Sequence, residues 1–291
     1  MQAALTLARG VLHARLTRVL ALVTAGTVAF VSLERLPRLD LGPVLFGLVP
    51  WVFGKYVLCP LRWHGLSASG RSRRWHLRVY AESELLGLLT PGHSGADLWR
   101  AHQLHRVGLD RPTAFADVAL DRLVGAVGLA LFVVVAGAAL PSRVLVAALV
   151  LAAVVLAGAL LLRRHRPGLL PRRPAVPPRR LAHGLGLSMA YQLTILGLLL
   201  GGLAATGHTV APLALLGVFG ASQIAGIVPG VHGAGPKEGA LVAGLVALGV
   251  PLWSALGAVS VVAVSAWGPA LLLGGGCLLV QRLRRSSVVA V

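Results

Sequence analysis

Two glycine- and proline-rich turns, each followed by charges of both signs, are the places where this chain could bind a charged ligand. They read "TPGHSGADLWR" and "VPGVHGAGPKEG". The candidate binding residues are Pro91, Gly92, Gly95, Asp97 and Arg100 around the first turn, and Pro229, Gly233, Gly235, Lys237 and Glu238 around the second. A helix that starts directly after such a turn exposes unpaired N–H groups, and this geometry binds phosphate. The alternative for the glycines is close helix packing or a plain surface turn.

The second turn carries the signals of a helix start. Gly235 fits the N-cap position, Pro236 fits the first helical position, and Glu238 falls in the first turn, where a carboxylate is favourable. A helix is predicted to start in the same way at Gly95, with Asp97 in its first turn. Both helices would then direct the positive ends of their dipoles toward the turns.

A third charged segment, "ADVALDRLVGAVGLALF", opens a long apolar run. Asp117 and Asp121 are four residues apart, so they share one helix face, and Arg122 follows directly. Charged side chains in a membrane helix are costly unless they pair or face a cavity, which favours a binding role for Asp121 and Arg122. The alternative is an interfacial helix end, with the arginine reaching the lipid headgroups.

The sequence lacks the full residue sets that a nucleotide-binding, metal-binding or catalytic site would need. "GVHGAGPK" resembles a nucleotide-binding loop, but a proline interrupts the motif before Lys237 and no Ser or Thr follows. His102 and His105 with Asp97 are candidate metal ligands without any further ligand, and a polar helix face explains them equally well. No nucleophile and base are readable. We therefore expect a protein that is not an enzyme and has no metal and no cofactor.

The composition indicates a membrane protein. Charged residues make up 12% of the 291 residues, about half of the ~25% that soluble domains contain. The net charge is +18, and the arginines cluster between apolar runs long enough to cross about 30 Å of hydrocarbon. Basic clusters beside membrane spans favour cytoplasmic loops and anionic lipid over nucleic acid. The predicted spans are Leu16–Leu33, Leu41–Leu58, Ala114–Leu140, Val144–Leu162, Leu181–Ala205 and Leu252–Val280.

Arginine-rich connections set the predicted orientation. The segment Arg62–Arg78 and the segment 163–180, "RRHRPGLLPRRPAVPPRR", are predicted to be basic loops, and the C-terminal tail carries further arginines. By the positive-inside rule, both termini and both basic loops lie in the cytoplasm. The first span is expected to remain uncleaved. The predicted location is a bacterial-type cytoplasmic (inner) membrane, crossed several times.

Two segments remain beside the six predicted spans. Leu77–Leu109 has to begin and end inside, and Leu213–Val250 has to begin and end outside. Each has two short helical stretches around its turn, which fits a re-entrant hairpin made of a broken helix; a pair of full crossings fits the same parity. The predicted fold is an all-α polytopic membrane protein, one integral membrane domain over residues 1–291, with about six full transmembrane helices and two re-entrant hairpins. Residues 1–140 and 141–291 would form an inverted repeat, whose broken helices point to a transport site near the midplane.

The three charged segments resemble the flippase-like family of the lysylphosphatidylglycerol synthase transmembrane region, also catalogued as an uncharacterised inner-membrane family. That family shows a P-G-x-x-G turn followed by an acidic residue and Arg, then L-x-R-x-G, an acidic-Arg pair and a late P-x-x-x-G-x-G-x-(basic)-E-G. The matching residues are Pro91, Gly92, Gly95, Asp97, Arg100, Leu104, Arg106, Gly108, Asp121, Arg122, Pro229, Gly233, Gly235, Lys237, Glu238 and Gly239. His93 replaces a usual Arg, Asp121 replaces Glu and Lys237 replaces Arg.

The resemblance implies a lipid translocator that moves a phospholipid or polyprenyl-phosphate-linked headgroup through a charged cavity between the two halves. It implies the translocating region without the soluble aminoacyl-transferring domain of larger members. The phosphate would be bound by the basic residues Arg100, Arg122 and Lys237. The acidic residues Asp97, Asp121 and Glu238 would pair with them in the empty site or bind a cationic headgroup. The expected partners are membrane lipids, namely anionic phospholipids or polyprenyl-phosphate conjugates, and a separate synthase or glycosyltransferase. The alternative is a non-catalytic accessory subunit, or a membrane enzyme, of lipid-linked glycan or aminoacyl-lipid synthesis.

Overall fold

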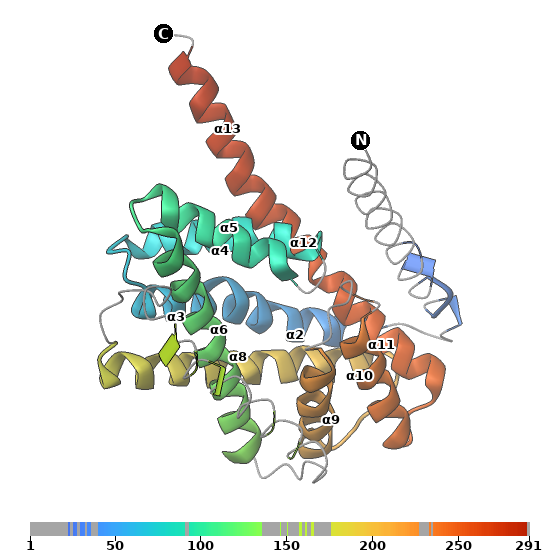
Figure 1. Cartoon of the computed structure of the whole chain (residues 1–291). Coiled ribbons are helices and arrows are strands. Elements are labelled where there is room, and N and C mark those ends of the chain that lie inside the picture. Colours follow the sequence, from blue (N-terminus) through green and yellow to red (C-terminus); the bar gives the residue numbers. More distant parts are fainter. Residues whose placement is uncertain are drawn as a thin grey trace, which may run out of the picture.

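The computed structural model describes residues 40–90, 93–135, 176–226, 233 and 235–289, with scattered positions between 23 and 35 and between 146 and 165. The described residues form helices and no strand (Figure 1). The helices are α2 (Leu41–Phe53), η1 (Gly54–Leu58), α3 (Cys59–Leu66), α4 (Arg73–Leu88), α5 (Ser94–Arg106), α6 (Arg111–Val135), α8 (Pro178–Ala205), α9 (Pro212–Ala225), α10 (Pro236–Ala247), α11 (Leu252–Ser265), α12 (Trp267–Pro269), η4 (Ala270–Gly275) and α13 (Gly276–Val289).

α2, η1 and α3 form one continuous helix, Leu41–Leu66. Its middle part, η1, is a π-helix, a widened turn that is common at functional sites. Pro60 follows η1, and because proline has no N–H to donate, regular α-helical bonding is interrupted here. The prediction that Arg62–Arg78 is a loop is wrong, since only residues 67–72 connect α3 to α4. Arg62 is therefore a helix residue, held inside the protein by a partner described below.

The long helix Leu41–Leu66 lies antiparallel to α8, and the two backbones are in close contact. The N–H of Asp40, just before α2, donates to the last carbonyl of α8 at 3.1 Å. At the opposite end, the side chain of Arg62 lies near Gly184. A Cβ atom on Gly47 would come within 2.7 Å of the carbonyl oxygen of Gly197, so only glycine fits at position 47. This helix pair crosses the middle of the molecule (Figure 1).

Three helices of the described part are long and apolar enough to cross a membrane: Leu41–Leu66, Pro178–Ala205 and Leu252–Leu283. They coincide with three of the predicted spans. α6 forms a helix of 25 residues where the span Ala114–Leu140 is predicted. The predicted spans Leu16–Leu33 and Val144–Leu162 lie mostly outside the described residues, so the total of about six full spans stays a prediction.

The two segments that surround the Pro-Gly turns each form a pair of short helices in mutual contact. α4 and α5 make the first pair, and α9 and α10 make the second. α4 has 16 residues and α5 has 13. At 1.5 Å per residue these helices are roughly 24 and 20 Å long, shorter than the hydrocarbon layer of about 30 Å. In the order of the chain, α4–α5 comes between the long helices Leu41–Leu66 and α6, and α9–α10 comes between α8 and Leu252–Leu283.

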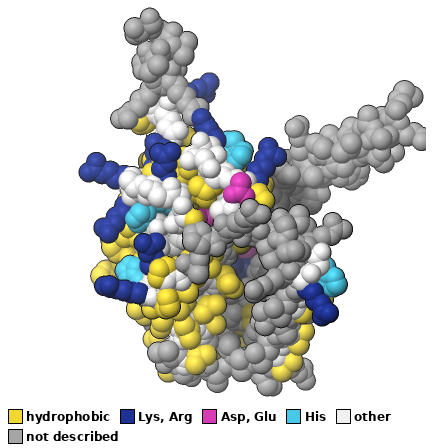
Figure 2. All heavy atoms as spheres, turned by 60° about the vertical axis from the view of Figure 1, so that its left-hand side comes forward, with side chains coloured by type: hydrophobic (Ala, Val, Ile, Leu, Met, Phe, Trp, Pro, Cys, Tyr) yellow, Lys and Arg dark blue, Asp and Glu magenta, His cyan; other side chains and the backbone are white. Residues whose placement is uncertain are grey.

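Basic residues gather at one end of the molecule. α3 and α5 end there, and α4, α6 and α8 begin there, on the left of Figure 1. His64 interacts electrostatically with Arg73 and Arg180 at this end. Figure 2 brings this end forward and shows basic and histidine side chains over its upper and middle parts and mainly hydrophobic side chains toward the bottom. Both ends of the α4–α5 pair therefore lie on the basic side.

Two apolar clusters frame the remaining polar groups. One includes Phe132, Leu203 and Leu215 and joins α6, α8, α9, α10 and α11. The other is built around Trp63 and Leu104 and joins α3, α4, α5 and α6. The second cluster fixes the four helices that carry the charged residues of the candidate site.

Candidate functional site

A carboxylate on α6 holds two arginines from two other helices inside the protein. Asp121 accepts a hydrogen bond from Arg62 Nε at 2.8 Å through one oxygen and from Arg100 Nη1 at 2.8 Å through the other. All three side chains are at most 7% exposed. Buried charges persist only when they are paired, so Asp121 is what allows both guanidinium groups to be inside.

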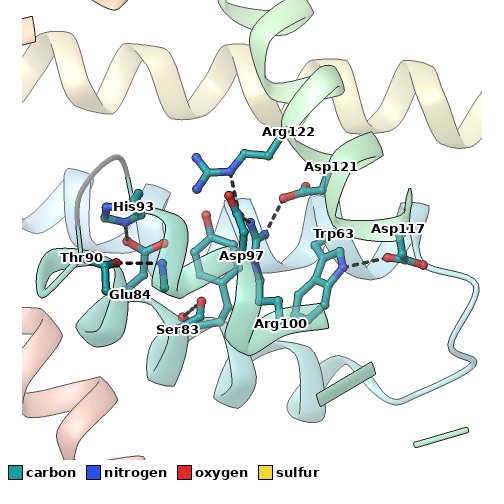
Figure 3. A network of polar contacts seen from close by, with 12 residues as sticks. Trp63, Ser83, Glu84, Thr90, His93, Asp97, Arg100, Asp117, Asp121 and Arg122 are labelled. Atoms are coloured by element: carbon teal, nitrogen blue, oxygen red, sulfur yellow. Dashed lines mark hydrogen bonds and ion pairs between the residues drawn. The ribbon is translucent and has the colours of Figure 1, made fainter. Parts of the chain in front are cut away.

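The ion pairs continue from Arg100 toward the surface (Figure 3). Asp97 Oδ1 accepts from Arg100 Nη2 at 2.6 Å and from Arg122 Nε at 3.0 Å. Exposure rises along this path, to 34% for the Asp97 side chain and 47% for that of Arg122. We call these residues the arginine–aspartate network: Arg62, Asp121, Arg100, Asp97 and Arg122. Its three guanidinium groups and two carboxylates give a net charge of 3 − 2 = +1.

Aromatic rings hold the central arginine in place. The guanidinium carbon of Arg100 lies 5.4 Å from the centre of the Trp63 ring and 5.2 Å from that of Tyr80. Such cation–π contacts are strongest when they are shielded from water. Asp117 in turn fixes Trp63, because its carboxylate accepts from the indole N–H at 2.9 Å and from a backbone N–H of the α3–α4 connection at 2.8 Å. Asp117 therefore positions the network and is not a member of it.

A second charged cluster lies where α4 approaches α5 at the tip of their pair. Glu84 Oε2 lies 2.9 Å from Lys55 Nζ and 2.9 Å from His93 Nε2. Lys55 belongs to the π-helix η1, near the middle of the span Leu41–Leu66. We call Lys55, Glu84 and His93 the Glu84 cluster. It places an ion pair near half the depth of a membrane-spanning helix, where an unpaired charge would be costly.

The backbone at His93 is unusual. Its φ of 62° lies in the left-handed region, which residues other than Gly rarely adopt. The imidazole packs on Gly87, where a Cβ atom would come within 2.6 Å of Nε2. His93 also interacts electrostatically with Arg122. The Glu84 cluster and the arginine–aspartate network are thus neighbours, and Figure 3 shows the guanidinium end of Arg122 directed toward the side on which His93 lies.

The start of α5 is fixed by the first turn. Thr90 Oγ1 accepts from the N–H of Gly95 at 2.7 Å and donates to the carbonyl of Leu86 at 2.9 Å. A Cβ atom on Gly95 would come within 2.7 Å of that carbonyl, so close packing explains this glycine. α5 begins at Ser94 with Asp97 in its first turn, close to the predicted start. Pro91 and Gly92 lie outside the described residues.

The start of α10 agrees with the prediction. Gly235 is the N-cap, Pro236 is the first helical residue, and Glu238 lies in the first turn. The Glu238 carboxylate accepts from the N–H of Gly233 at 3.3 Å and from that of Gly235 at 2.9 Å. Two backbone amides of the second turn are therefore occupied by the protein's own carboxylate. Pro229 lies outside the described residues.

Lys237 interacts electrostatically with one member of the Glu84 cluster. Its side chain packs near Gly226 at the end of α9. It interacts electrostatically with its neighbour Glu238 and with Lys55. Within the described residues, no ion pair joins Lys237 or Glu238 to the arginine–aspartate network. The prediction that both turns contribute to one site therefore stays a prediction.

Sequence reasoning found Asp97, Arg100, Asp121 and Arg122, which the fold brings into one network. It missed Arg62, Lys55 and Glu84. For Lys55 a signal existed, because it is an ionisable residue within an apolar stretch, and such residues indicate function by default. Glu84 lies in a helix with several other charged residues, so its sequence context did not single it out. For Arg62, the position at the end of an apolar run pointed to a loop.

The arrangement suits the binding of an anion. Its outermost group, Arg122, is a half-exposed guanidinium, and behind it every carboxylate of the network already has a basic partner. A guanidinium group recognises phosphate through paired N–H donors. Among the described residues, no group of three or more His, Cys, Asp or Glu side chains could hold a metal ion.

Comparison with known proteins identifies the family of this chain. The family model described as the lysylphosphatidylglycerol synthase TM region matches residues 5–274. No curated protein and no solved structure matched. The match covers nearly the whole chain, including both turns and all members of the two charged groups, and it agrees with an all-helical protein that has membrane-spanning helices. The chain therefore belongs to the family of the lysylphosphatidylglycerol synthase transmembrane region.

Proposed function

We propose that this protein is a lipid translocator, which moves the phosphate-bearing headgroup of a phospholipid or a polyprenyl-phosphate-linked lipid across the cytoplasmic membrane. The headgroup enters at Arg122 and passes the Glu84 cluster, while the acyl chains stay in the bilayer. The protein binds and releases the lipid without any catalytic step. Family membership supports a membrane protein related to lipid handling; the assignment of transport and of the headgroup is ours.

The observation that carries this proposal is the gradient of exposure along the arginine–aspartate network. Ion pairs run without a gap from Arg62, at 7% side-chain exposure, to Arg122, at 47%. Ion pairs with a purely structural role need only pair with one another inside the protein, and no charged group has to reach the surface. This network instead ends in a half-exposed cation, which is where an incoming phosphate would replace the carboxylate of Asp97 as partner.

The helix lengths support the proposed topology of about six full spans and two re-entrant hairpins. α4 and α5 are each too short to cross the hydrocarbon layer, and both ends of their pair lie on the basic side of the molecule. In this topology, the basic side faces the cytoplasm, as the positive-inside rule requires. The tip of the α4–α5 pair then reaches the depth of Lys55, and the second pair approaches from the other side, as in an inverted repeat.

The decisive experiment measures lipid movement between leaflets in vesicles that contain only the purified protein. A fluorescent phosphatidylglycerol is placed in both leaflets, and a reductant that cannot cross the membrane destroys the label outside. With the translocator present, label from the inner leaflet should also be lost. Vesicles without protein supply the baseline. Equal curves for vesicles with and without protein would exclude the proposed activity for this lipid class.

Arg122→Gln tests the site itself. It removes the outermost cation of the network, and we expect movement to slow by at least tenfold because the headgroup loses its first phosphate contact. The matched control is Arg111→Gln, which neutralises an exposed arginine at the start of α6, the helix that carries Arg122. The control should move lipid at the wild-type rate. Equal rates for the two variants would show that Arg122 is not the entry point.

A further inference from the structure

His93 shares its carboxylate partner with a lysine. Glu84 Oε2 is 2.9 Å from both His93 Nε2 and Lys55 Nζ, and the other atoms of the cluster are largely shielded, with side-chain exposures of 6% for Glu84 and 17% for Lys55. His93 is the most accessible member, at 23%. A single carboxylate thus balances one permanent cation and one residue that can become a cation near neutral pH.

The hydrogen-bond pattern fixes which nitrogen of His93 takes up a proton. Glu84, ionised beside Lys55, can only accept hydrogen bonds. The contact with His93 Nε2 therefore requires the proton of the neutral ring to be on Nε2. Nδ1 is then the atom that gains a proton when the ring becomes charged. Protonation adds one positive charge and one new N–H donor, while the bond to Glu84 is kept.

The surroundings of His93 are already rich in positive charge. Several elements contribute the charged and titratable groups that face the His93–Glu84 pair: Lys55 and Tyr56 of η1, Cys59 of α3, Tyr80 of α4, Arg122 of α6 and Tyr191 of α8. Asp97 of α5 is linked to the pair through Arg122, and Lys237 of α10 through Lys55. A charge on His93 is opposed first by the burial of the ring and then by the nearby cations Lys55 and Arg122, while Glu84 favours it. An anion bound between His93 and Arg122 favours protonation, because it gives the buried ring a second negative partner and offsets the charge of Arg122.

We propose that His93 is a proton-binding site and that the protein binds one proton together with each phosphodiester headgroup. The headgroup phosphate lies between Arg122 and His93, and each ligand strengthens the binding of the other, as linkage requires. The proposal rests on the proposed function, which it extends by naming a proton as the second ligand. No bond is made or broken apart from the N–H bond on Nδ1, whose proton comes from the solvent.

The test measures lipid binding as a function of pH. The full chain is placed in phosphatidylcholine nanodiscs, and the probe is a fluorescent short-chain phosphatidylglycerol, a phosphodiester whose own charge does not change near neutral pH. If only protein with a protonated His93 binds, the apparent Kd is divided by the protonated fraction, so it should rise up to about tenfold per pH unit above the pKa of the ring. A second measurement on the wild type, with a pH-indicator dye in weak buffer, should show uptake of close to one proton per lipid bound in the same range.

His93→Asn is the variant of choice, because Asn tolerates the left-handed backbone and does not titrate. It should bind the probe with a Kd that is flat with pH. The matched control, His102→Gln, removes an exposed histidine of α5, the helix that follows His93, and should keep the wild-type slope. A flat wild-type curve with clear binding, or a slope that survives in His93→Asn, overturns the proton site and leaves the translocator standing. Absence of binding at every pH overturns both. If His93→Asn does not fold, the proton uptake of the wild type decides alone.

Discussion

Asp121→Asn should strongly destabilise this protein. Asp121 is 1% exposed and is the partner that holds Arg62 and Arg100 in the interior. The amide of Asn keeps one oxygen but loses the charge, so two charge-assisted hydrogen bonds of 2.8 Å are lost or weakened. At about 1.5–3 kcal/mol for each, the expected loss is roughly 3–6 kcal/mol, in line with the ~3–5 kcal/mol for removal of one partner of a buried ion pair.

Asp97→Asn is the matched comparison, since it makes the same chemical change in the same network. Asp97 is 34% exposed, and Arg100 keeps Asp121 as its partner when Asp97 is neutral. We expect a loss of at most about 1 kcal/mol. The assay is reversible unfolding in mixed micelles, monitored by the fluorescence of the tryptophans near the network. The unfolding equilibrium should shift by roughly 10² to 10⁴-fold for Asp121→Asn. The double variant Asp121→Asn with Arg62→Met should recover part of the loss, because one stranded cation is removed.

Equal stability of the two aspartate variants would refute this reasoning. So would a double variant that is less stable than Asp121→Asn alone, because burial of an unpaired Arg62 would then not be the source of the cost.

Two further predictions concern helix packing and topology. Gly47→Ala should lower the free energy of unfolding by about 1–3 kcal/mol, because its Cβ would meet the backbone of α8 at 2.7 Å, whereas Gly197→Ala, with nothing within 4 Å, should be neutral or stabilising in the same unfolding assay. Cysteine-accessibility mapping should label Arg71→Cys from the cytoplasmic side and Thr209→Cys from the outside, in a background where Cys59 and Cys277 are replaced. Labelling of both from one side would contradict the orientation.

The sequence was sufficient for the helical class, for three helices long and apolar enough to span a membrane and for the start of α10, because these follow from local patterns. Apolar run length predicts a span, and Gly235, Pro236 and Glu238 satisfy the capping rules without help from distant residues. The same holds for the grouping of Asp97 with Arg100, which are three residues apart on one helix.

Long-range partners were not predictable in this way. Arg62 and Asp121 are 59 residues apart, and only the packing of α3 on α6 and α8 brings them together. Without that partner, an arginine after an apolar run reads as the end of a span. The π-helix η1 is likewise invisible to a search for the regular helical period, although it is what carries Lys55 toward Glu84. Pairing across helices and local helix distortions are properties of the packed protein.

The glycine contact between Leu41–Leu66 and α8 has a mechanical consequence. With the Cβ space at Gly47 and Gly201 filled by the partner's backbone, a shift of one helix along the other by a single residue, about 1.5 Å, would drive side chains into carbonyl groups. The pair can therefore rotate or tilt only as one rigid body. Any alternation between inward- and outward-open states has to come from elements that pack on this helix pair through side chains, above all the α4–α5 and α9–α10 pairs. Lys55 belongs to the rigid helix pair, so it would keep its position while the α4–α5 and α9–α10 pairs move relative to it.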